Sequence, residues 1–445
     1  MAPETVTLAD LVESRDIGQL RDWLEEQGAL DIADELARLE PHLRPVPFRL
    51  LPKDRALAVF EALDTVHQSE LLDALADVDV DELFVGLDAD DRARLLDELP
   101  AKVARRLLDG LPEWARRNTN ILLGYPEESA GRQMSPRFVS IRSSMTAADA
   151  LTKVRRAGLR SREVLVLPVT DDERHLVGVV DLPDLVTAPV GTRVEELTNP
   201  DTYTVQVDDD QELAARLIQE ADLVALPVLD HEDRLVGVLT VDDAMEVIEQ
   251  EETEDIHRAG GVEPLSVPYL EAGVLLLARK RALWLLLLGV AAVLTVTVIG
   301  GFEDRIEEVS TLALFIPLLI DTGGNSGAQA STVVIRAMAV GEVRLADLPR
   351  ILRRELLVGM MLGAMLGLLA FVPVWLFIDI GFATVISLTL FFICVWATFA
   401  GGLLPPIAKK LGIDPAVFSA PVITTLVDAT GLLIYFSIAV AVLGI

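Results

Sequence analysis

The sequence predicts a multidomain membrane protein with an all-helical N-terminal domain, a tandem pair of α/β repeats, a connecting helix and five transmembrane helices. Three observations predict this fold class. Nearly all long apolar runs of the 445 residues lie after position 281, the stretch 167–186 is repeated at 226–245, and an acidic segment follows the repeat. We expect domain boundaries at 1–130, 131–245, 246–270 and 271–445.

The region 1–130 shows helical periodicity interrupted by prolines. In the stretches 95–99 and 104–108, apolar residues recur at helical spacing with charged residues between them. Prolines at positions 41, 45, 47, 52, 100 and 112 divide the region into short segments, because proline begins or ends helices. A small all-helical domain is therefore expected here.

The stretch 167–186 recurs as 226–245, with ten of the twenty positions identical. Each copy predicts a strand, an acidic turn, a second strand and a helix, with a further helix before it at 147–157 or 211–220. This pattern resembles a tandem pair of CBS domains, a regulatory module that often binds adenine nucleotides. The resemblance makes ATP a candidate ligand of the pair.

An acidic segment, 241–258, separates the repeat from the apolar part of the chain. On a helix, Asp243 and Glu246 would share one face, and Glu251 and Glu254 would share another. Like charges at this spacing oppose helix formation by tenths of a kcal/mol per pair. A bound divalent cation would offset this repulsion; a solvated acidic helix or linker is the alternative interpretation.

The first membrane-length segment orients the chain. Residues 282–302 are uncharged for 21 positions, enough to span a bilayer. Arg279, Lys280 and Arg281 precede the segment and acids follow it. Because basic residues stay on the cytoplasmic side, the amino end of this span is expected inside.

The later segments continue this alternation. The second, 309–335, ends near five arginines, and 356–408 has Asp379 as its only charge, so it predicts two helices that turn near that residue. Lys409 and Lys410 follow the stretch 356–408 and place its end on the cytoplasmic side. A fifth span then runs from about 414 to the end. A multi-pass protein of the plasma membrane is expected, with cytoplasmic N-terminal domains and an external C-terminus.

The excess of negative charge lies in the part of the chain that precedes the membrane-length segments. The region 1–270 holds 57 of the 69 acids and 27 of the 38 bases, an excess that repels nucleic acid and anionic lipid and concentrates cations. The only cysteine, Cys394, excludes an intrachain disulfide. The stretch 1–16 contains acids and no long apolar core, so we expect no signal peptide.

Two features place oxygen ligands at membrane depth. Asp428 lies in the last segment with no basic residue near it, and such an acid costs roughly 2.5 to 3.5 kcal/mol, so it usually faces a water-filled ion path. The stretch 317–329, with a proline and three glycines, is expected to unwind and turn carbonyls toward a cavity, although close helix packing is the alternative. Together they predict a cation site formed by Asp428, Thr424, Gly324 and Asn325.

The available ligands favour a hard divalent cation. The five histidines lie outside the predicted spans and the single cysteine has no thiol partner, so soft metals are poorly served. Carboxylates and carbonyls suit magnesium, which keeps several of its waters. A membrane potential of about 100 mV supplies roughly 4.6 kcal/mol for a divalent ion, and we find no phosphate-binding loop. Uptake without ATP hydrolysis is therefore expected.

The order of these parts resembles that of the MgtE family of magnesium channels over essentially the whole chain. The matching motifs are Gly-Gly-Asn-Ser-Gly-Ala-Gln at 323–329, Asp-Pro-Ala at 414–416, the stretch 421–431 and Thr-Glu-Asp-Ile-His at 253–257. The resemblance implies a homodimer with the pore at the subunit interface and Asp428 as the pore aspartate. It also implies that residues 242–262 form a plug helix, which closes the pore when magnesium bridges it to the CBS domains.

The resemblance further assigns sensor acids in the second CBS copy, along the plug helix, at the mouth of the pore and in the helical domain. These are Asp210, Glu212, Asp222, Asp243, Glu246, Glu251, Glu254, Asp255 and Asp414, with Asp88 and Asp91 as looser matches. Asp321 departs from the family pattern, so it either adds a pore charge or lies at the dimer interface. High internal magnesium would bind the closed arrangement and shift the population toward it.

A CBS-regulated secondary carrier for another divalent cation or solute is the alternative function. An anion carrier is disfavoured because the spans have no basic residue deep inside. An intramembrane metalloprotease needs a His-Glu-x-x-His site in a span, and the spans lack histidine, so we expect no enzyme. Channel and slow carrier stay open, as do magnesium, manganese, cobalt and calcium.

Overall fold

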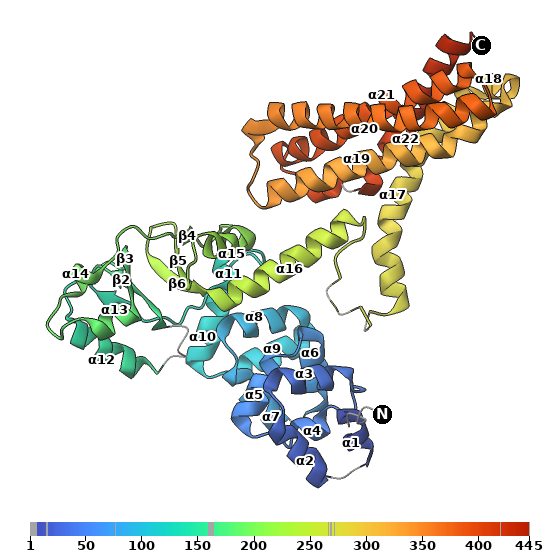
Figure 1. The fold of residues 1–445 in the computed structure, drawn as a ribbon. Helices are drawn as coiled ribbons and strands as arrows, with labels where there is room; N and C mark the ends of the chain where they lie inside the picture. The colour runs from blue at the N-terminus through green and yellow to red at the C-terminus, as the bar shows by residue number, and fades with distance from the viewer. Residues whose placement is uncertain are drawn as a thin grey trace. The chain divides into compact units, whose positions relative to one another are not determined.

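The computed structural model describes residues 7–14, 17–75, 77–158, 164–265, 267, 269–270, 272–418 and 420–444. The chain forms two compact units, Met1–Gln250 and Glu251–Ile445, each of which is described by itself (Figure 1).

The first unit begins with short helices that pack in a regular order. They are α1 (Leu8–Ser14), α2 (Ile17–Glu26), α3 (Ala29–Arg38), α4 (Pro45–Phe48), α5 (Lys53–Glu61), α6 (Thr65–Ala74), α7 (Asp77–Gly86), α8 (Ala89–Glu98), α9 (Ala101–Gly110) and α10 (Glu113–Leu122). From α3 to α10 most helices pack against the next but one, as α3 does on α5 and α6 on α8. Phe60 and Phe84 lie fully buried between them. The predicted all-helical domain is confirmed.

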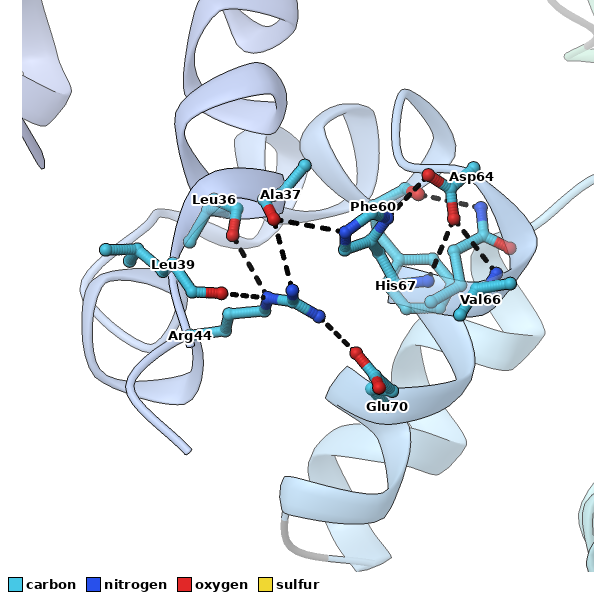
Figure 2. Close-up of polar contacts among 10 residues, drawn as sticks. Leu36, Ala37, Leu39, Arg44, Phe60, Asp64, Val66, His67 and Glu70 are labelled. Carbon is cyan, nitrogen blue, oxygen red and sulfur yellow. Dashed lines mark hydrogen bonds and ion pairs between the residues drawn. The ribbon is translucent and has the colours of Figure 1, made fainter. Parts of the chain in front are cut away.

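Two buried basic side chains connect the C-terminal end of α3 to α6 through polar contacts (Figure 2). Arg44 donates to the carbonyl of Ala37 at 3.1 Å and pairs with Glu70. Nδ1 of His67 lies 2.5 Å from Oδ2 of Asp64, and its Nε2 lies 3.1 Å from the same Ala37 carbonyl. Because both ring nitrogens face acceptors, a doubly protonated ring satisfies both contacts. Positive charge at the C-terminal end of α3 also suits the helix dipole.

Replacing Asp64 by Asn should destabilise this domain by about 1 kcal/mol at pH 7, because the variant loses the carboxylate that contacts His67. The effect stays small because this carboxylate is 41% exposed and solvent screens part of its interaction. Burial raises the pKa of Asp64, but the hydrogen bonds and charge of His67 outweigh burial and lower the pKa overall. A lowered pKa stabilises the fold above the ordinary value, and this stabilisation is lost as the pH falls through the lowered one. Thermal unfolding should therefore separate D64N from wild type at pH 7, and the difference should shrink as the pH falls below the ordinary pKa of an aspartate. The exposed Asp73 on α6 gives the matched control, D73N; equal effects of both variants would contradict the prediction.

The two repeats of the first unit have the same local fold. The first contains β1 (Ile141–Arg142), α12 (Ala147–Ala157), β2 (Val166–Thr170), β3 (Leu176–Asp181), α13 (Leu182–Thr187) and α14 (Val194–Leu197), and α11 (Ala130–Gln133) precedes it. The second contains β4 (Val205–Gln206), α15 (Gln211–Glu220), β5 (Ala225–Leu229), β6 (Leu235–Thr240) and the start of α16 (Val241–Ala259).

The strand registers reproduce the repeat seen in the sequence. Pro168 lies opposite Val179 in the first sheet, and Pro227 lies opposite Val238 in the second. In each sheet the first strand is parallel to the second and the third is antiparallel, with an irregularity at Thr170 or Leu229. The predicted tandem α/β pair is therefore confirmed, and its two sheets share one register.

The second unit consists of long helices and short connecting turns. These are α17 (Val274–Gly301), α18 (Glu303–Glu308), η2 (Ser310–Phe315), α19 (Ile316–Ala339), η3 (Leu345–Asp347), α20 (Leu348–Phe377), α21 (Ile380–Lys410), η4 (Pro415–Phe418) and α22 (Ala420–Leu443). Within the described residues, four stretches are long and apolar enough to cross a membrane, namely α17, Leu345–Phe377, α21 and α22. The fifth long helix, α19, is 24 residues long, as α22 is, but it carries Asp321, Arg336 and many small polar residues.

Two boundaries can be compared with the sequence. Asp379 lies at the turn between α20 and α21, where its side chain accepts from the backbone N–H groups of Gly381 and Phe382, so the predicted turn is confirmed. The first span was expected to begin after the basic triplet, but α17 begins at Val274 and includes Arg279 to Arg281. Their long side chains can extend from the helix toward water, so they need not end it.

Glycines bring α20 close to α21. Gly359, Gly363 and Gly367 recur every four residues on α20, and a Cβ at each would lie within 2.8 Å of α21 atoms. At Gly363 the obstructing atoms belong to the backbone of Phe391. Small residues at this spacing allow the direct backbone contact that joins membrane helices.

Candidate functional site

The glycine-rich stretch of α19 is helical throughout, so the expectation that it unwinds is wrong. The helix runs without interruption from Ile316 to Ala339. A Cβ on Gly323 would lie 2.6 Å from Ile393, and one on Gly327 would lie 2.8 Å from Ile423. The glycines therefore let α19 pack closely on α21 and α22, as the alternative interpretation held, because any side chain would force the helices apart.

Asp428 lies on α22 beside the glycines of α19. A Cβ on Gly324 would lie 3.5 Å from Oδ1 of Asp428 and 3.0 Å from Cγ2 of Thr424. Within the described part of the chain, this buried Oδ1 has no hydrogen-bond partner. A carboxylate oxygen inside a helix bundle without a donor is costly unless a cation or water faces it.

The other predicted pore residues differ in whether they lie close to Asp428. Thr424 lies one turn earlier on α22, and its hydroxyl donates to the carbonyl of Pro421 at 2.9 Å. Asn325 follows Gly324 and is exposed, as is Asp321 one turn before it. The geometry therefore brings Asp428, Thr424 and Gly324 together within one chain, whereas Asn325 lies on the surface of the unit.

A second acidic centre joins the helical domain to the second repeat inside the first unit. Carboxylate oxygens of Glu61, Asp88 and Asp91 lie within 4.8 Å of one another, and they form the one such group among the described residues. Arg94 on α8 reaches across to Glu246 on α16 with a distance of 2.6 Å, and it lies 3.9 Å from Asp91. Clustered carboxylates of this kind suit a hard divalent cation.

Asp91 and the neighbouring Asp243 hold their protons more tightly than usual. Burial raises the pKa of Asp91 to about 6, with Glu246, Asp88 and Glu61 raising it further and Arg94 opposing them. Burial raises the pKa of Asp243 to about 7, with support from Asp242, Asp91 and Glu246, although a hydrogen bond from Thr240 acts against this.

Mutual repulsion of these carboxylates destabilises the metal-free centre at neutral pH, and a divalent cation would relieve that repulsion. Burial is the main cause of the raised pKa values of Asp91 and Asp243, and repulsion between the acids of α8 and those at the start of α16 adds to it.

Sequence reasoning named Asp88, Asp91, Asp243 and Glu246 but missed two members of the centre. Glu61 is the last residue of α5, and nothing in its local sequence marks it. Asp90 is 5% exposed, and burial together with Asp243 raises its pKa well above the usual value. The close succession of acids in the stretch 88–91 was the available signal for it.

The acids of the second repeat that the sequence predicts as sensors have other environments. Asp210 caps α15 by accepting from the backbone N–H of Glu212 at 2.8 Å. Glu212 pairs with Arg216 one turn later at 2.6 Å. Asp222 is exposed in a left-handed conformation with φ 52° between α15 and β5. These three acids do not belong to the described Glu61 centre.

The remaining predicted sensor acids lie in the second unit. Glu254 on α16 pairs with Arg258 one turn later, and Arg258 also lies 2.5 Å from Asp414, just before η4. Glu251 and Asp255 are half-buried on the same helix. The structure therefore joins Glu254 and Asp414 through one guanidinium, a contact the sequence did not reveal.

Comparison with known proteins agrees with this organisation. Family models match residues 28–128 as the MgtE intracellular N domain, residues 132–191 and 194–250 as CBS domains, and residues 316–438 as a divalent cation transporter. The crystal structure of the cytosolic domain of the Mg2+ channel MgtE in complex with ATP aligns with 54% of this chain and 99% of its own, at 36% identity and a TM-score of 0.52.

Two curated relatives extend the match to the membrane part. The magnesium transporter MgtE of Thermus thermophilus is 38% identical over 98% of this chain and 97% of its own. The magnesium transporter MgtE of Enterococcus faecalis is 37% identical over 72% of this chain and 70% of its own. The chain belongs to the MgtE family.

Proposed function

We propose that this chain forms a homodimeric magnesium channel that takes up Mg2+ into the cytoplasm and closes when internal magnesium is high. The observation that carries the pore assignment is the buried, unpartnered Oδ1 of Asp428 within the described helix bundle. The two curated relatives are named magnesium transporters, which supports magnesium as the ion. Five helices, α17 and α19 to α22, cross the plasma membrane and leave the C-terminus outside.

The pore holds hydrated magnesium rather than a bare ion. Magnesium gives up its waters reluctantly, and Asp428 is a single carboxylate beside Gly324. Waters of the ion donate to this carboxylate and to the hydroxyl oxygen of Thr424, and the second subunit supplies a second copy of the same groups. Asn325, on the exposed side of α19, completes the lining in the dimer.

Closure depends on the acidic centres. Magnesium bound by Glu61, Asp88, Asp91, Asp243 and Glu246 neutralises carboxylates that otherwise repel one another, so it stabilises the arrangement in which it binds. The end of α16 acts as the plug in that arrangement. The acids that contribute further sensor contacts in the dimer are Asp210, Glu212, Asp222, Glu251, Glu254, Asp255 and Asp414.

Four functional parts follow from this proposal: a sensor domain at 1–130, the CBS pair at 131–245, the plug at 246–270 and the pore domain at 271–445. The CBS pair is also proposed to bind ATP, on the support of the related cytosolic domain solved with that nucleotide. ATP serves as a ligand there rather than as an energy source.

The proposal is tested with the intact chain in liposomes. Magnesium influx driven by a negative internal potential is expected at low internal magnesium and should fall as internal magnesium rises into the millimolar range. A matched series with internal potassium at equal ionic strength controls for screening. Influx that is equal at all internal magnesium concentrations would contradict closure by magnesium.

A CBS-regulated secondary carrier for another divalent cation is the second candidate. Coupling to a second ion separates the two functions: a carrier needs a co-substrate gradient, whereas a channel responds to the magnesium gradient and potential alone.

A further inference from the structure

The last turns of α16 hold a guanidinium between two carboxylates from different elements. Nη1 of Arg258 lies 2.5 Å from Oδ2 of Asp414, and Nη2 pairs with Glu254 one turn earlier. The side chains of the three residues are 36%, 31% and 27% exposed, in the order Arg258, Asp414 and Glu254. They are therefore partly shielded from solvent.

Asp414 is oriented for this contact by the chain that follows it. Its Oδ1 accepts from the backbone N–H of Ala416 at 2.8 Å, which leaves Oδ2 for the guanidinium. The turn η4 then leads into α22, the helix that carries Asp428. The ion pair thus joins the end of α16 to the start of the candidate pore helix.

Two further contacts hold the same end of α16. Glu252 lies 3.4 Å from Arg336 near the end of α19. Gly261 has a φ of +67°, and a Cβ there would lie 3.2 Å from the ring of Pro421, so the backbone passes close to the beginning of α22. Among these contacts at the end of α16, Arg258 makes the one in which a single cationic side chain bridges two acids.

We propose that Arg258 is a positioning residue that acts as a built-in cation, holding the end of α16 against the mouth of the pore when no metal is bound. This inference rests on the proposed function and deepens its regulation. The guanidinium supplies positive charge between Glu254 and Asp414, where carboxylates alone would repel. Because the contact is partly exposed, it is weak enough to break when the pore opens.

The functional test compares R258Q, R258K and R350Q in the intact chain in liposomes. Arg350 provides the matched control because it is 86% exposed and pairs with Asp347 within its own segment. With a chelator inside, R258Q should raise magnesium influx about two- to fivefold, the range expected for a partly exposed ion pair. R258K should fall between R258Q and wild type, and R350Q should match wild type.

A structural measurement tests the contact without using transport. Amide hydrogen exchange of residues 251–259, in chelator, should be faster in R258Q and in D414N than in wild type or R350Q. The R258Q/D414N double variant should exchange no faster than the quicker single variant, because both remove the same bond.

Unchanged exchange in R258Q, or additive effects in the double variant, would overturn the tether. Unchanged influx in an R258Q variant with faster exchange would overturn its role in closure. If the exchange results are as expected but wild type carries no magnesium, the contact stands and the proposed function is the part that fails.

Discussion

Replacing Asp428 by Asn is expected to reduce magnesium influx at least about 100-fold, which corresponds to roughly 3 kcal/mol of lost stabilisation for the permeating ion. A unit charge about 4 Å from another contributes roughly 4 kcal/mol at an effective dielectric constant of about 20, and a divalent ion doubles that interaction. Retained waters place magnesium farther away and reduce the gain. Asn keeps the size of the side chain, so packing against Gly324 and Thr424 should persist.

The measurement is initial influx of magnesium into liposomes at low internal magnesium, with the amount of folded protein checked by size-exclusion chromatography. Asp379→Asn is the control, because Asp379 is exposed at the turn between α20 and α21 and makes only capping contacts in the described structure. Equal influx in D428N and wild type would remove Asp428 from the ion path. Equal loss in D428N and D379N would indicate a general charge or folding effect instead.

The parts of the fold that sequence predicted are those whose physics is local or repeated. The copy of 167–186 at 226–245 carries the same strands in the same register, because both copies bury the apolar residues of their central strand and a shifted pairing would move those residues out of the core. Asp379 marked a turn because it is the one charge between two apolar stretches that are each long enough for a span.

The glycine-rich part of α19 shows why composition alone was insufficient. Glycines weaken a helix in water, but the same residues allow close contact when a neighbouring helix lies against them. The choice between unwinding and packing depends on Ile393 and Ile423, which lie on helices far along the chain. Only their position shows that Gly323 and Gly327 are covered.

The candidate sites follow the same rule. Asp428 was evident because an acid in an apolar span is unusual wherever the chain folds. Glu61 and the Arg258–Asp414 pair were not evident from the sequence, because their significance arises from contacts between segments that are distant along the chain. Acidic side chains are common on the surface, so a site made from them becomes visible only when tertiary structure brings them together.

The Asp243→Asn variant should stabilise the metal-free protein at pH 7.5 by an amount on the order of 2 kcal/mol. The pKa of Asp243 is about 7 in the folded chain, so its ionisation at higher pH works against folding, chiefly because the half-buried carboxylate loses hydration and also because it faces Asp242, Asp91 and Glu246. The full shift corresponds to roughly 4 kcal/mol, and partial exposure of the side chain reduces it.

The pH dependence has a definite sign. A carboxyl whose folded pKa is raised binds its proton more tightly in the native state, so its contribution to stability falls as the pH rises from about 4 to about 7. Wild type and D243N should therefore unfold at similar temperatures at pH 4.5 and diverge at pH 7.5 in chelator. Glu249→Gln is the control, since Glu249 is exposed on the same helix.

Magnesium should reduce the stability difference between wild type and D243N, because it binds the carboxylates that repel without it. At pH 7.5, millimolar magnesium is expected to raise the unfolding temperature of intact wild-type protein more than that of D243N. In liposomes, D243N should carry less magnesium than wild type at low internal magnesium and should respond less steeply to its rise. A larger magnesium-induced stabilisation in D243N than in wild type would show that Asp243 is no ligand, since the asparagine cannot replace the lost charge.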